Sequence, residues 1–462
     1  MRSSWALCLL LMATWPAEMQ GQNLFQRMLG RKQGNSALSD DIPTAALSNG
    51  IKIPLVGIGV GNMVQEVIPA IVSHAMRNDK KTRLIDTSSV SQNEHLVAKG
   101  IVDGADYLVN AGEEKVEVHV ITKVWYTHLG YERTMIAVQN SIEALKPAFD
   151  HPNVDLKLHV MIHWPRCYDT IPWMNCEAEE NLLPDEIKSL PPPPHTDKVN
   201  AWKGSWKALE ALYKDENSPV TSIGVSNFHV KELEALVELA TVKPHLLEAN
   251  IWSFLYDPLL VNYAHRHNIH LVAFQVMEGI LRNPQRTPFG YHHLLHVCNE
   301  LSKNMRSKAL MSEDAEVTAP MGVLAWLVQH SVSVVPKTTD LQHLKDNSAV
   351  SMHKIPSMTE KQAQIVAYAV EALISGDDME EDAAIRITFH AKTKDLYLWW
   401  RDDEDDVEVM IKTIKKGEKF EERSHPGHKF KVYDHEDKNQ ASVEVFQVPA
   451  SGRYGDHHDV EL

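Results

Sequence analysis

Between residues 51 and 347, short apolar runs alternate with amphipathic segments, and this alternation constrains the fold more than any other feature of the chain. Eight runs have the length and composition of buried strands: "IPLVGIGV", "TRLIDT", "VEVHVITKV", "LKLHVMIHW", "SIGVSN", "HLLEANI", "HLVAFQV" and "VSVVPKT". Segments between them, such as "RTMIAVQNSIEALKPAF", carry apolar residues at steps of three and four, which predicts helices. Eight strand–helix units in roughly 300 residues predict an α/β fold of the (β/α)8 TIM-barrel type.

An open, doubly wound parallel sheet is the rival fold. It usually has a glycine-rich phosphate-binding turn with G-x-G-x-x-G spacing after its first strand. The corresponding stretch here, "GIGVGN" at 57–62, lacks that spacing. The sequence therefore favours the closed barrel.

Most of the predicted strands end in polar or chargeable residues: Asp86, Lys123, His163, Ser226 with Asn227, Glu248 with Asn250, Gln275 and Lys337. In a closed parallel barrel these ends converge at the C-terminal mouth, where barrel active sites are built. Strands that simply reach solvent would explain one or two such residues. They explain less well an acid, an amine and an imidazole on three successive strands. The pattern predicts that Asp86, Lys123 and His163 surround one cavity.

The first 21 residues have the pattern of a secretory signal peptide, in which an arginine precedes the apolar run "WALCLLLMATW". A membrane anchor or a buried first helix is the alternative. Residues 22–44 are expected to be flexible. No later run is long enough to span a bilayer, so no membrane insertion is expected after signal removal. These features predict the secretory pathway, either the endoplasmic reticulum lumen or the extracellular space.

The cysteines allow one short disulfide. Cys167 and Cys176 flank "RCYDTIPWMNC" and could pair in an oxidising compartment, with free thiols as the alternative. The cysteines and histidines of this sequence do not have the spacing of a metal site, so no metal site is predicted. The formal net charge of −16 argues against a nucleic-acid-binding surface, because phosphate attraction needs a basic face.

The hydrophobic period changes near the end of the barrel segment, which is predicted to span residues 45–372. An acidic stretch that contains "GDDMEEDAA" follows, and residues 373–383 are interpreted as a linker. Runs of period two then predict a small all-β sandwich over residues 384–449. Residues 450–462 are expected to form a disordered tail.

The barrel segment, residues about 45–350, resembles the aldo-keto reductase superfamily. The motifs that carry the resemblance are "IPLVGIGVG", "LIDTSSVSQNE", "VITKVW", "VMIHWP", "SIGVSNF" and "VVPKTTDLQHLKDN", in the family's order. The resemblance implies an oxidoreductase that passes a hydride from a nicotinamide cofactor, NADP or NAD, to the carbonyl of a small aldehyde or ketone.

By motif, Asp86, Lys123 and His163 match the aspartate, lysine and histidine of the family's catalytic site. The proton donor in that family is a tyrosine five residues after the aspartate, and this chain has Ser91 there. A serine hydroxyl is much less acidic than a phenol, whose pKa is about 10, and its side chain is shorter. Two other donors are conceivable: a protonated His163, or Tyr126 reaching in from the next loop.

The resemblance also implies residues that bind the cofactor: Ser226 and Asn227 at the nicotinamide carboxamide, Phe274 stacked on its ring, Lys337 and Thr338 at the phosphates, and Asp346 with Asn347 near the adenine. Two positions depart from the family. Glu248 stands where the family has a glutamine, and His343 replaces the arginine that grips the 2'-phosphate of NADP. Loss of that arginine weakens the preference for NADP over NAD.

The segment from residue 396 to residue 434 resembles the β domain of the von Hippel–Lindau tumour suppressor. The shared features are a strand that ends in Trp400, a "KKGE" turn, and Ser424 and His428 before a late strand. The resemblance implies a groove that binds a peptide, including one that contains hydroxyproline. Phe430 and Ile411 replace two aromatic residues of that family.

Two functions follow from these patterns. The first is an aldo-keto-reductase-like oxidoreductase whose catalysis is impaired or altered, because Ser91 replaces the tyrosine. The alternative is a non-catalytic cofactor-sensing or scaffold protein whose β domain binds a peptide.

Overall fold

The computed structural model describes residues 42–461, except for 169, 191–196, 198–199, 252–256, 278–286, 313–314, 376–384, 403–406, 425–428, 436–441, 443 and 449–456. The chain divides into two compact units, one up to residue 376 and one from residue 377. The division lies within the predicted linker, 373–383.

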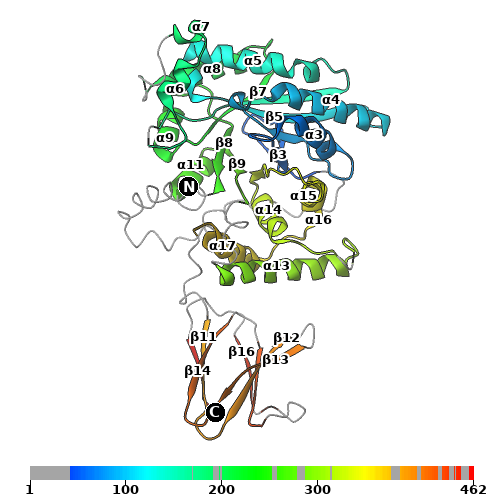
Figure 1. Cartoon of the computed structure of the whole chain (residues 1–462), viewed down its shortest axis with the longest axis vertical. Helices are drawn as coiled ribbons and strands as arrows, with labels where there is room; N and C mark the ends of the chain where they lie inside the picture. Colours follow the sequence, from blue (N-terminus) through cyan, green and yellow to red (C-terminus); the bar gives the residue numbers. More distant parts are fainter. Residues whose placement is uncertain are drawn as a thin grey trace. The chain divides into compact units, whose positions relative to one another are not determined.

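The first unit is built on eight parallel strands that pair with one another in chain order (Figure 1). They are β3 (Gly57–Gly59), β4 (Leu84–Asp86), β5 (Val116–Val124), β6 (Val154–Ile162), β7 (Val220–Ser226), β8 (Leu246–Asn250), β9 (His270–Phe274) and β10 (Ser333–Val334). A parallel bridge between Val56 and Val334 joins the last strand to the first. This closure confirms the predicted (β/α)8 barrel.

Helices follow the strands and cover the outside of the barrel (Figure 1). The described α-helices are α3 (Ile68–Met76), α4 (Glu94–Asn110), α5 (Tyr131–Phe149), α6 (Cys176–Asn181), α7 (Asp185–Lys188), α8 (Ala201–Lys214), α9 (Val230–Leu239), α11 (Pro258–Arg266), α13 (Pro288–Ser307), α14 (Ala319–Gln329), α15 (Leu341–Asp346), α16 (Ala349–Lys354) and α17 (Glu360–Ser375). A hairpin of β1 (Thr44–Ala46) and β2 (Lys52–Pro54) precedes the barrel. The long strand β5 is buried at all but one position, as expected for parallel strands covered on both faces.

A layer of polar side chains lies inside the barrel, away from the strand ends that carry the predicted site. His119 Nδ1 lies 3.0 Å from His159 Nε2, and His159 Nδ1 lies 2.5 Å from Ser222 Oγ. Both imidazoles are almost fully buried. The sequence interpretation did not single out these histidines. Burial lowers the pKa of His159 well below its usual value, and the neighbouring imidazoles of His119, His245 and His270 lower it further.

The second unit is a small all-β sandwich of two sheets. Its strands are β11 (Ile385–His390), β12 (Leu396–Asp402), β13 (Val407–Ile414), β14 (Lys419–Ser424), β15 (Lys429–Tyr433), β16 (Glu444–Gln447) and β17 (His457–Glu461). The sheet orders are β14-β11-β17 and β13-β12-β15-β16. Phe389 from one sheet packs on Phe430 from the other with 5.5 Å between ring centroids. The predicted all-β fold of this segment is confirmed.

The prediction of a disordered tail over 450–462 is wrong for its last part. His457–Glu461 form β17, which pairs in parallel with β11. Val460 is the only apolar residue of this strand and it joins the sandwich core, so the period-two signal was too short to recognise.

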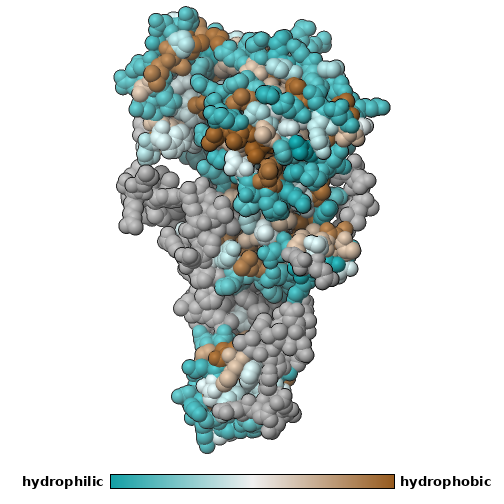
Figure 2. Space-filling model, turned by 45° about the vertical axis from the view of Figure 1, so that its right-hand side comes forward, coloured by the Kyte–Doolittle hydropathy of each residue, from teal (hydrophilic) through white to brown (hydrophobic). Residues whose placement is uncertain are grey.

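The described residues can be compared with the requirements of a membrane-spanning element. On the face shown in Figure 2, the described apolar residues form separate groups within a mainly hydrophilic surface. Among the described helices, none is both long and apolar enough to cross a membrane.

Candidate active site

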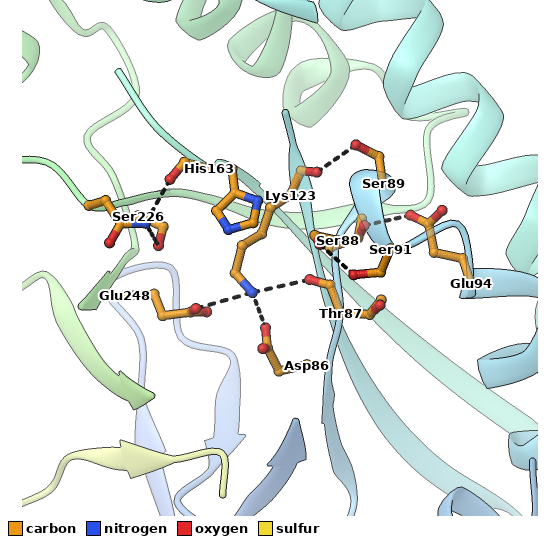
Figure 3. A network of polar contacts seen from close by, with 12 residues as sticks. Asp86, Thr87, Ser88, Ser89, Ser91, Glu94, Lys123, His163, Ser226 and Glu248 are labelled. Atoms are coloured by element: carbon orange, nitrogen blue, oxygen red, sulfur yellow. Dashed lines mark hydrogen bonds and ion pairs between the residues drawn. The ribbon is translucent and has the colours of Figure 1, made fainter. Parts of the chain in front are cut away.

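The ends of β4, β5 and β6 bring Asp86, Lys123 and His163 together (Figure 3). Asp86 is the last residue of β4, Lys123 is the second-to-last of β5, and His163 directly follows β6. The parallel register places Asp86 beside Ile121 and Lys123 beside Met161, so the three side chains stand at neighbouring positions of the same barrel end. The predicted juxtaposition of these residues is present in the structure.

Lys123 is a buried ammonium group with three oxygen partners. Its Nζ makes an ion pair with Asp86, lies 3.1 Å from Glu248 Oε1, and donates to the carbonyl oxygen of Thr87 at 3.1 Å. Only 4% of the lysine is exposed. Burial by itself would lower the pKa of Lys123, but the carboxylates of Asp86 and Glu248 outweigh it, and the pKa is raised. Lys123 is therefore a permanent cation at neutral pH.

Glu248 belongs to the same cluster, although the sequence interpretation placed it only on the cofactor side. It lies within β8 in register with Ser226, and it is 2% exposed. Its Oε2 is buried and accepts no hydrogen bond from the described residues. Burial raises the pKa of Glu248 to about 8, and the nearby Asp86 carboxylate acts in the same direction.

His163 is a neutral imidazole in this environment. Burial and the positive charge of Lys123 both lower the pKa of His163 well below its usual value. Its Nδ1 has no partner within the described part of the chain, and its ring meets Trp125 edge to face at 4.9 Å. A protonated His163 as the proton donor is therefore disfavoured.

Ser91 lies in the short 3-10 helix η3 (Ser89–Ser91), which follows β4. Its Oγ lies 3.0 Å from Ser88 Oγ, and Ser89 Oγ donates to the carbonyl oxygen of Lys123 at 2.9 Å (Figure 3). The contacts described for Ser91 do not include Asp86, Lys123 or His163. The side-chain hydrogen bond described for Ser91 is therefore a local one within the loop after β4.

The rest of the segment after β4 is held to neighbouring strands by hydrogen bonds. Asn93 Nδ2 donates to the carbonyl oxygen of Val60 at 3.0 Å, and Glu94 Oε1 accepts from Thr122 Oγ1 at 2.6 Å. Both residues are buried. The polar end of the "LIDTSSVSQNE" motif thus fixes the loop to the neighbouring strands.

Tyr126 does not supply the missing phenol either. It begins the 3-10 helix η4 (Tyr126–His128), is 1% exposed, and packs on Trp125 with 4.5 Å between ring centroids. Burial raises the pKa of Tyr126, and the Glu179 carboxylate raises it further. Both effects make the Tyr126 hydroxyl a weaker acid. The ring lies beside Glu179 of α6.

Ser226 and Asn227 form a fixed corner next to the cluster. Ser226 is fully buried at the end of β7, and Asn227 has the left-handed φ of 57° that asparagine tolerates. The Asn227 Nδ2 donates to the carbonyl oxygen of His163 at 3.0 Å, and its backbone N donates to that of Glu248 at 3.1 Å. Asn227 therefore links the residue that follows β6 to the strand β8. Phe274, half-buried, is the last residue of β9.

Lys337 and Thr338 line an open pocket of about 440 Å³ beyond the end of β10. The other lining residues are Asn62, Met63, Val64, Thr339, Asp340 and His343. Lys337 is exposed, and its Nζ reaches the carbonyl oxygen of Gly61 at 3.5 Å. Asn347 follows the last residue of α15 and does not line this pocket.

Three tryptophans near His163 were not predicted as site residues. Trp173 lies 6.3 Å from Trp125 and 5.8 Å from Trp164, measured between ring centroids. It is 59% exposed. A tryptophan directly after His163, and another between two cysteines, were the available sequence signals. Together with the imidazole, the three indoles make an aromatic wall at this end of the barrel.

The predicted disulfide is confirmed, because Cys167 and Cys176 are bonded. The bond closes the loop that carries Trp173 and joins the first residue of α6 to the segment after β6. Cys298 is a buried free thiol. Within the described ranges, no group of three or more histidine, cysteine or acidic side chains is arranged to hold a metal ion.

Of the predicted peptide-binding residues of the second unit, only the side chain of Ser424 lies within the described part of the chain. Ser424 ends β14 and is 1% exposed, so it lies inside the sandwich. Phe430 is part of the sandwich core. His428 and the side chain of Trp400 lie outside the described residues.

Comparison with known proteins places the barrel in one family. Residues 60–368 match the Aldo/keto reductase family. The chain is 28% identical to the glyoxal reductase of Bacillus subtilis over 313 residues, which cover 66% of this chain and 86% of the relative. It is 25% identical to the NAD(P)H-dependent D-xylose reductase of Kluyveromyces lactis, over 67% of this chain and 87% of the relative.

Solved structures of aldo-keto reductases are also similar to this chain. A crystal structure of a Bombyx mori aldo-keto reductase in complex with NADP shares 19% sequence identity, with a TM-score of 0.48. The match covers 73% of this chain and 93% of that one.

Proposed function

The chain belongs to the aldo/keto reductase family, and we propose that it is an oxidoreductase that uses NADP or NAD to reduce an aldehyde or ketone at the mouth of its barrel. The observation that carries this proposal is the cluster of Asp86, Lys123 and His163 at adjacent strand ends. Such a cluster offers a buried cation and a neutral imidazole to a carbonyl oxygen on which negative charge develops.

The residues present fit a nicotinamide dinucleotide. Lys337 supplies an exposed cation at the pocket beyond β10, where a phosphate could bind. His163 Nδ1 is a buried polar atom without a partner among the described residues, as expected where a polar ligand binds. When bound, the cofactor supplies a hydride. A relative named as NAD(P)H-dependent supports the choice of cofactor.

The side chains of this chain would act on the carbonyl without a phenol. His163 would donate a hydrogen bond from one ring nitrogen to the carbonyl oxygen, and the Lys123 ammonium would stabilise negative charge on it. Since neither Ser91 nor Tyr126 contacts this group, the final proton would come from water. Reduction should therefore be slower than in relatives that have the tyrosine, by about two to four orders of magnitude.

The aromatic wall suggests what the substrate looks like. Trp125, Trp164 and Trp173 present indole faces and edges beside His163. Flat apolar groups stack favourably on such surfaces. The preferred substrate would carry its carbonyl on an aromatic or otherwise flat apolar body.

A second candidate function is a non-catalytic cofactor sensor. The observation that favours it is the absence of any described phenol beside Lys123, since Ser91 bonds to Ser88 and Tyr126 lies beside Glu179. The proposed peptide partner of the β unit would belong to this alternative. The Cys167–Cys176 disulfide supports a location in the secretory pathway for either function, because disulfides persist in oxidising compartments.

One titration separates the two functions. The purified protein is mixed with NADPH or NADH, nucleotide fluorescence is followed, and a panel of aromatic and small aliphatic aldehydes is then added. Binding with turnover supports the reductase, and turnover should be lost in Lys123→Met. Binding without turnover supports the sensor. If neither nucleotide binds, both proposals are wrong.

A further inference from the structure

The short helix α6 is fixed to α5 by a buried ion pair. Arg133 of α5 is fully buried, and its guanidinium contacts the two carboxylate oxygens of Glu180 at 2.8 and 2.9 Å. The same guanidinium donates to the carbonyl oxygens of Thr127, Lys188 and Leu190 at 3.0, 3.2 and 3.3 Å. Because a bidentate pair between planar groups has a defined geometry, α6 has little freedom to shift relative to α5.

Two further contacts hold the first turn of this helix. Cys176, the first residue of α6, is bonded to Cys167 in the segment after β6. The side chain of Asn175 accepts a hydrogen bond from the backbone N of Ala178 at 3.2 Å and so caps the helix. A helix of six residues is not stable by itself, so these contacts and the ion pair of Glu180 keep it in place.

Glu179 connects this fixed helix to the candidate active site. It precedes Glu180 in α6, and its Oε2 accepts a hydrogen bond from the indole Nε1 of Trp125 at 2.8 Å. Trp125 directly follows β5, two residues after Lys123, and is 9% exposed. A hydrogen bond to a carboxylate is strong, so it fixes the direction of the indole N–H and with it the rotation of the ring.

The orientation of the Trp125 ring matters because the ring packs on His163. The indole meets the imidazole at 71°, with 4.9 Å between the ring centroids. His163 Nδ1 has no hydrogen-bond partner among the described residues, so no bond described at that nitrogen fixes the imidazole ring. Contact with the indole therefore limits the rotation of the imidazole on this side.

We propose that Glu179 is a positioning residue: by holding the indole of Trp125, it keeps the His163 imidazole in the orientation that donates a hydrogen bond to the substrate carbonyl. The proposal rests on the proposed function for the role of His163. Glu179 acts through the indole, so a hydrogen-bond acceptor at this position should matter more than its charge. It belongs to the segment after β6 rather than to a barrel strand, so the polar strand ends did not reveal it.

The two contacts are tested by NMR of the full chain without nucleotide or substrate. The indole N–H resonance of Trp125, identified by its loss in Trp125→Phe, should shift in Glu179→Ala. It should shift less in Glu179→Gln, because an amide oxygen still accepts the hydrogen bond. The imidazole resonances of His163, identified with His163→Gln, should also shift in Glu179→Ala. Glu177→Ala, at an exposed position of α6, is the matched control and should shift neither. Unchanged His163 resonances in Glu179→Ala would overturn the proposal.

The consequence for catalysis is tested by steady-state kinetics with NADPH and a small aliphatic aldehyde, at a temperature at which all variants are folded. Glu179→Ala should lower kcat by about tenfold to a hundredfold, because a small misplacement of a catalytic group is costly, and should leave KM within about threefold. Glu179→Gln should retain kcat within about threefold of the wild type, and so should Glu177→Ala. A merely structural role would lower thermal stability without this change in kcat.

The outcomes separate this proposal from the proposed function. Turnover by the wild type with an unchanged kcat in Glu179→Ala, or with equal losses in Glu179→Ala and Glu179→Gln, would overturn the role of Glu179 and leave the reductase intact. Absence of turnover in the wild type would overturn both.

Discussion

Glu248 Oε1 lies 3.1 Å from Lys123 Nζ, so the lysine that the motifs pair with Asp86 is shared between two carboxylates. The three groups are buried and belong to three different strands, β4, β5 and β8. Their charges are therefore coupled, and a change at any one of them should alter the other two.

Replacement of the shared lysine should destabilise the barrel strongly. Lys123→Met leaves Asp86 and Glu248 buried without their cation, and removal of one partner from a buried ion pair typically costs about 3–5 kcal/mol of the free energy of unfolding. Urea denaturation measures the change. Lys99→Met is the matched control, because Lys99 pairs with Asp103 on the exposed face of α4 and should change stability by no more than about 1 kcal/mol. Equal losses in both variants would contradict the assignment.

The barrel could be predicted from the sequence because every strand is a short apolar run between amphipathic helices, and Val56 and Val334 close the same sheet. Asp86, Lys123 and His163 were predictable for the same reason, since the closed fold brings strand ends to one place. The strand β17 was not predictable, because it has a single apolar residue and therefore no period-two pattern. Its backbone pairing with β11 stabilises it as a strand.

The electrostatic state of the site could not be predicted from the motifs. The Glu248 side chain reaches Lys123 from β8, three strands away from β5 in the sheet. This contact exists only because the sheet closes into a barrel. The burial of Tyr126 beside Glu179 is likewise tertiary. Motif matching gives residue types at strand ends, whereas partners across the barrel determine which of them carry a charge.

Introduction of a phenol at position 91 should raise carbonyl reduction. Ser91→Tyr places an acidic hydroxyl on η3 near the end of β4, and a positioned general acid contributes about a hundredfold or more. Initial rates with NADPH and an aromatic aldehyde measure the gain. Ser91→Phe is the control, because it has the same ring without the hydroxyl and should leave the rate unchanged. A rate that stays flat in Ser91→Tyr while nucleotide still binds would show that the site is misplaced.

The disulfide should keep Trp173 in the aromatic wall. Cys167→Ser opens the loop, and loss of a short disulfide loop costs about 2–3 kcal/mol of unfolding free energy. For aromatic aldehydes, KM should rise in both Cys167→Ser and Trp173→Ala, with little change for small aliphatic aldehydes, because only the former stack on the indole. Cys298→Ser, which changes the free thiol, controls for loss of a cysteine. If both substrate classes respond equally, Trp173 does not select the substrate.

Acidification should destabilise the barrel through the buried histidine layer. The pKa of His159 is lowered by burial and by its neighbouring imidazoles, so below about pH 6.5 the unfolded chain binds a proton that the folded chain excludes. The free energy of unfolding should therefore fall with decreasing pH, by at most about 1.4 kcal/mol per pH unit for this residue. The decline should be shallower in His159→Gln than in the wild type, whereas His95→Gln, at an exposed position of α4, should retain the wild-type slope. Urea denaturation at a series of pH values measures these slopes, and identical slopes in all three proteins would exclude His159 as the source of the acid sensitivity.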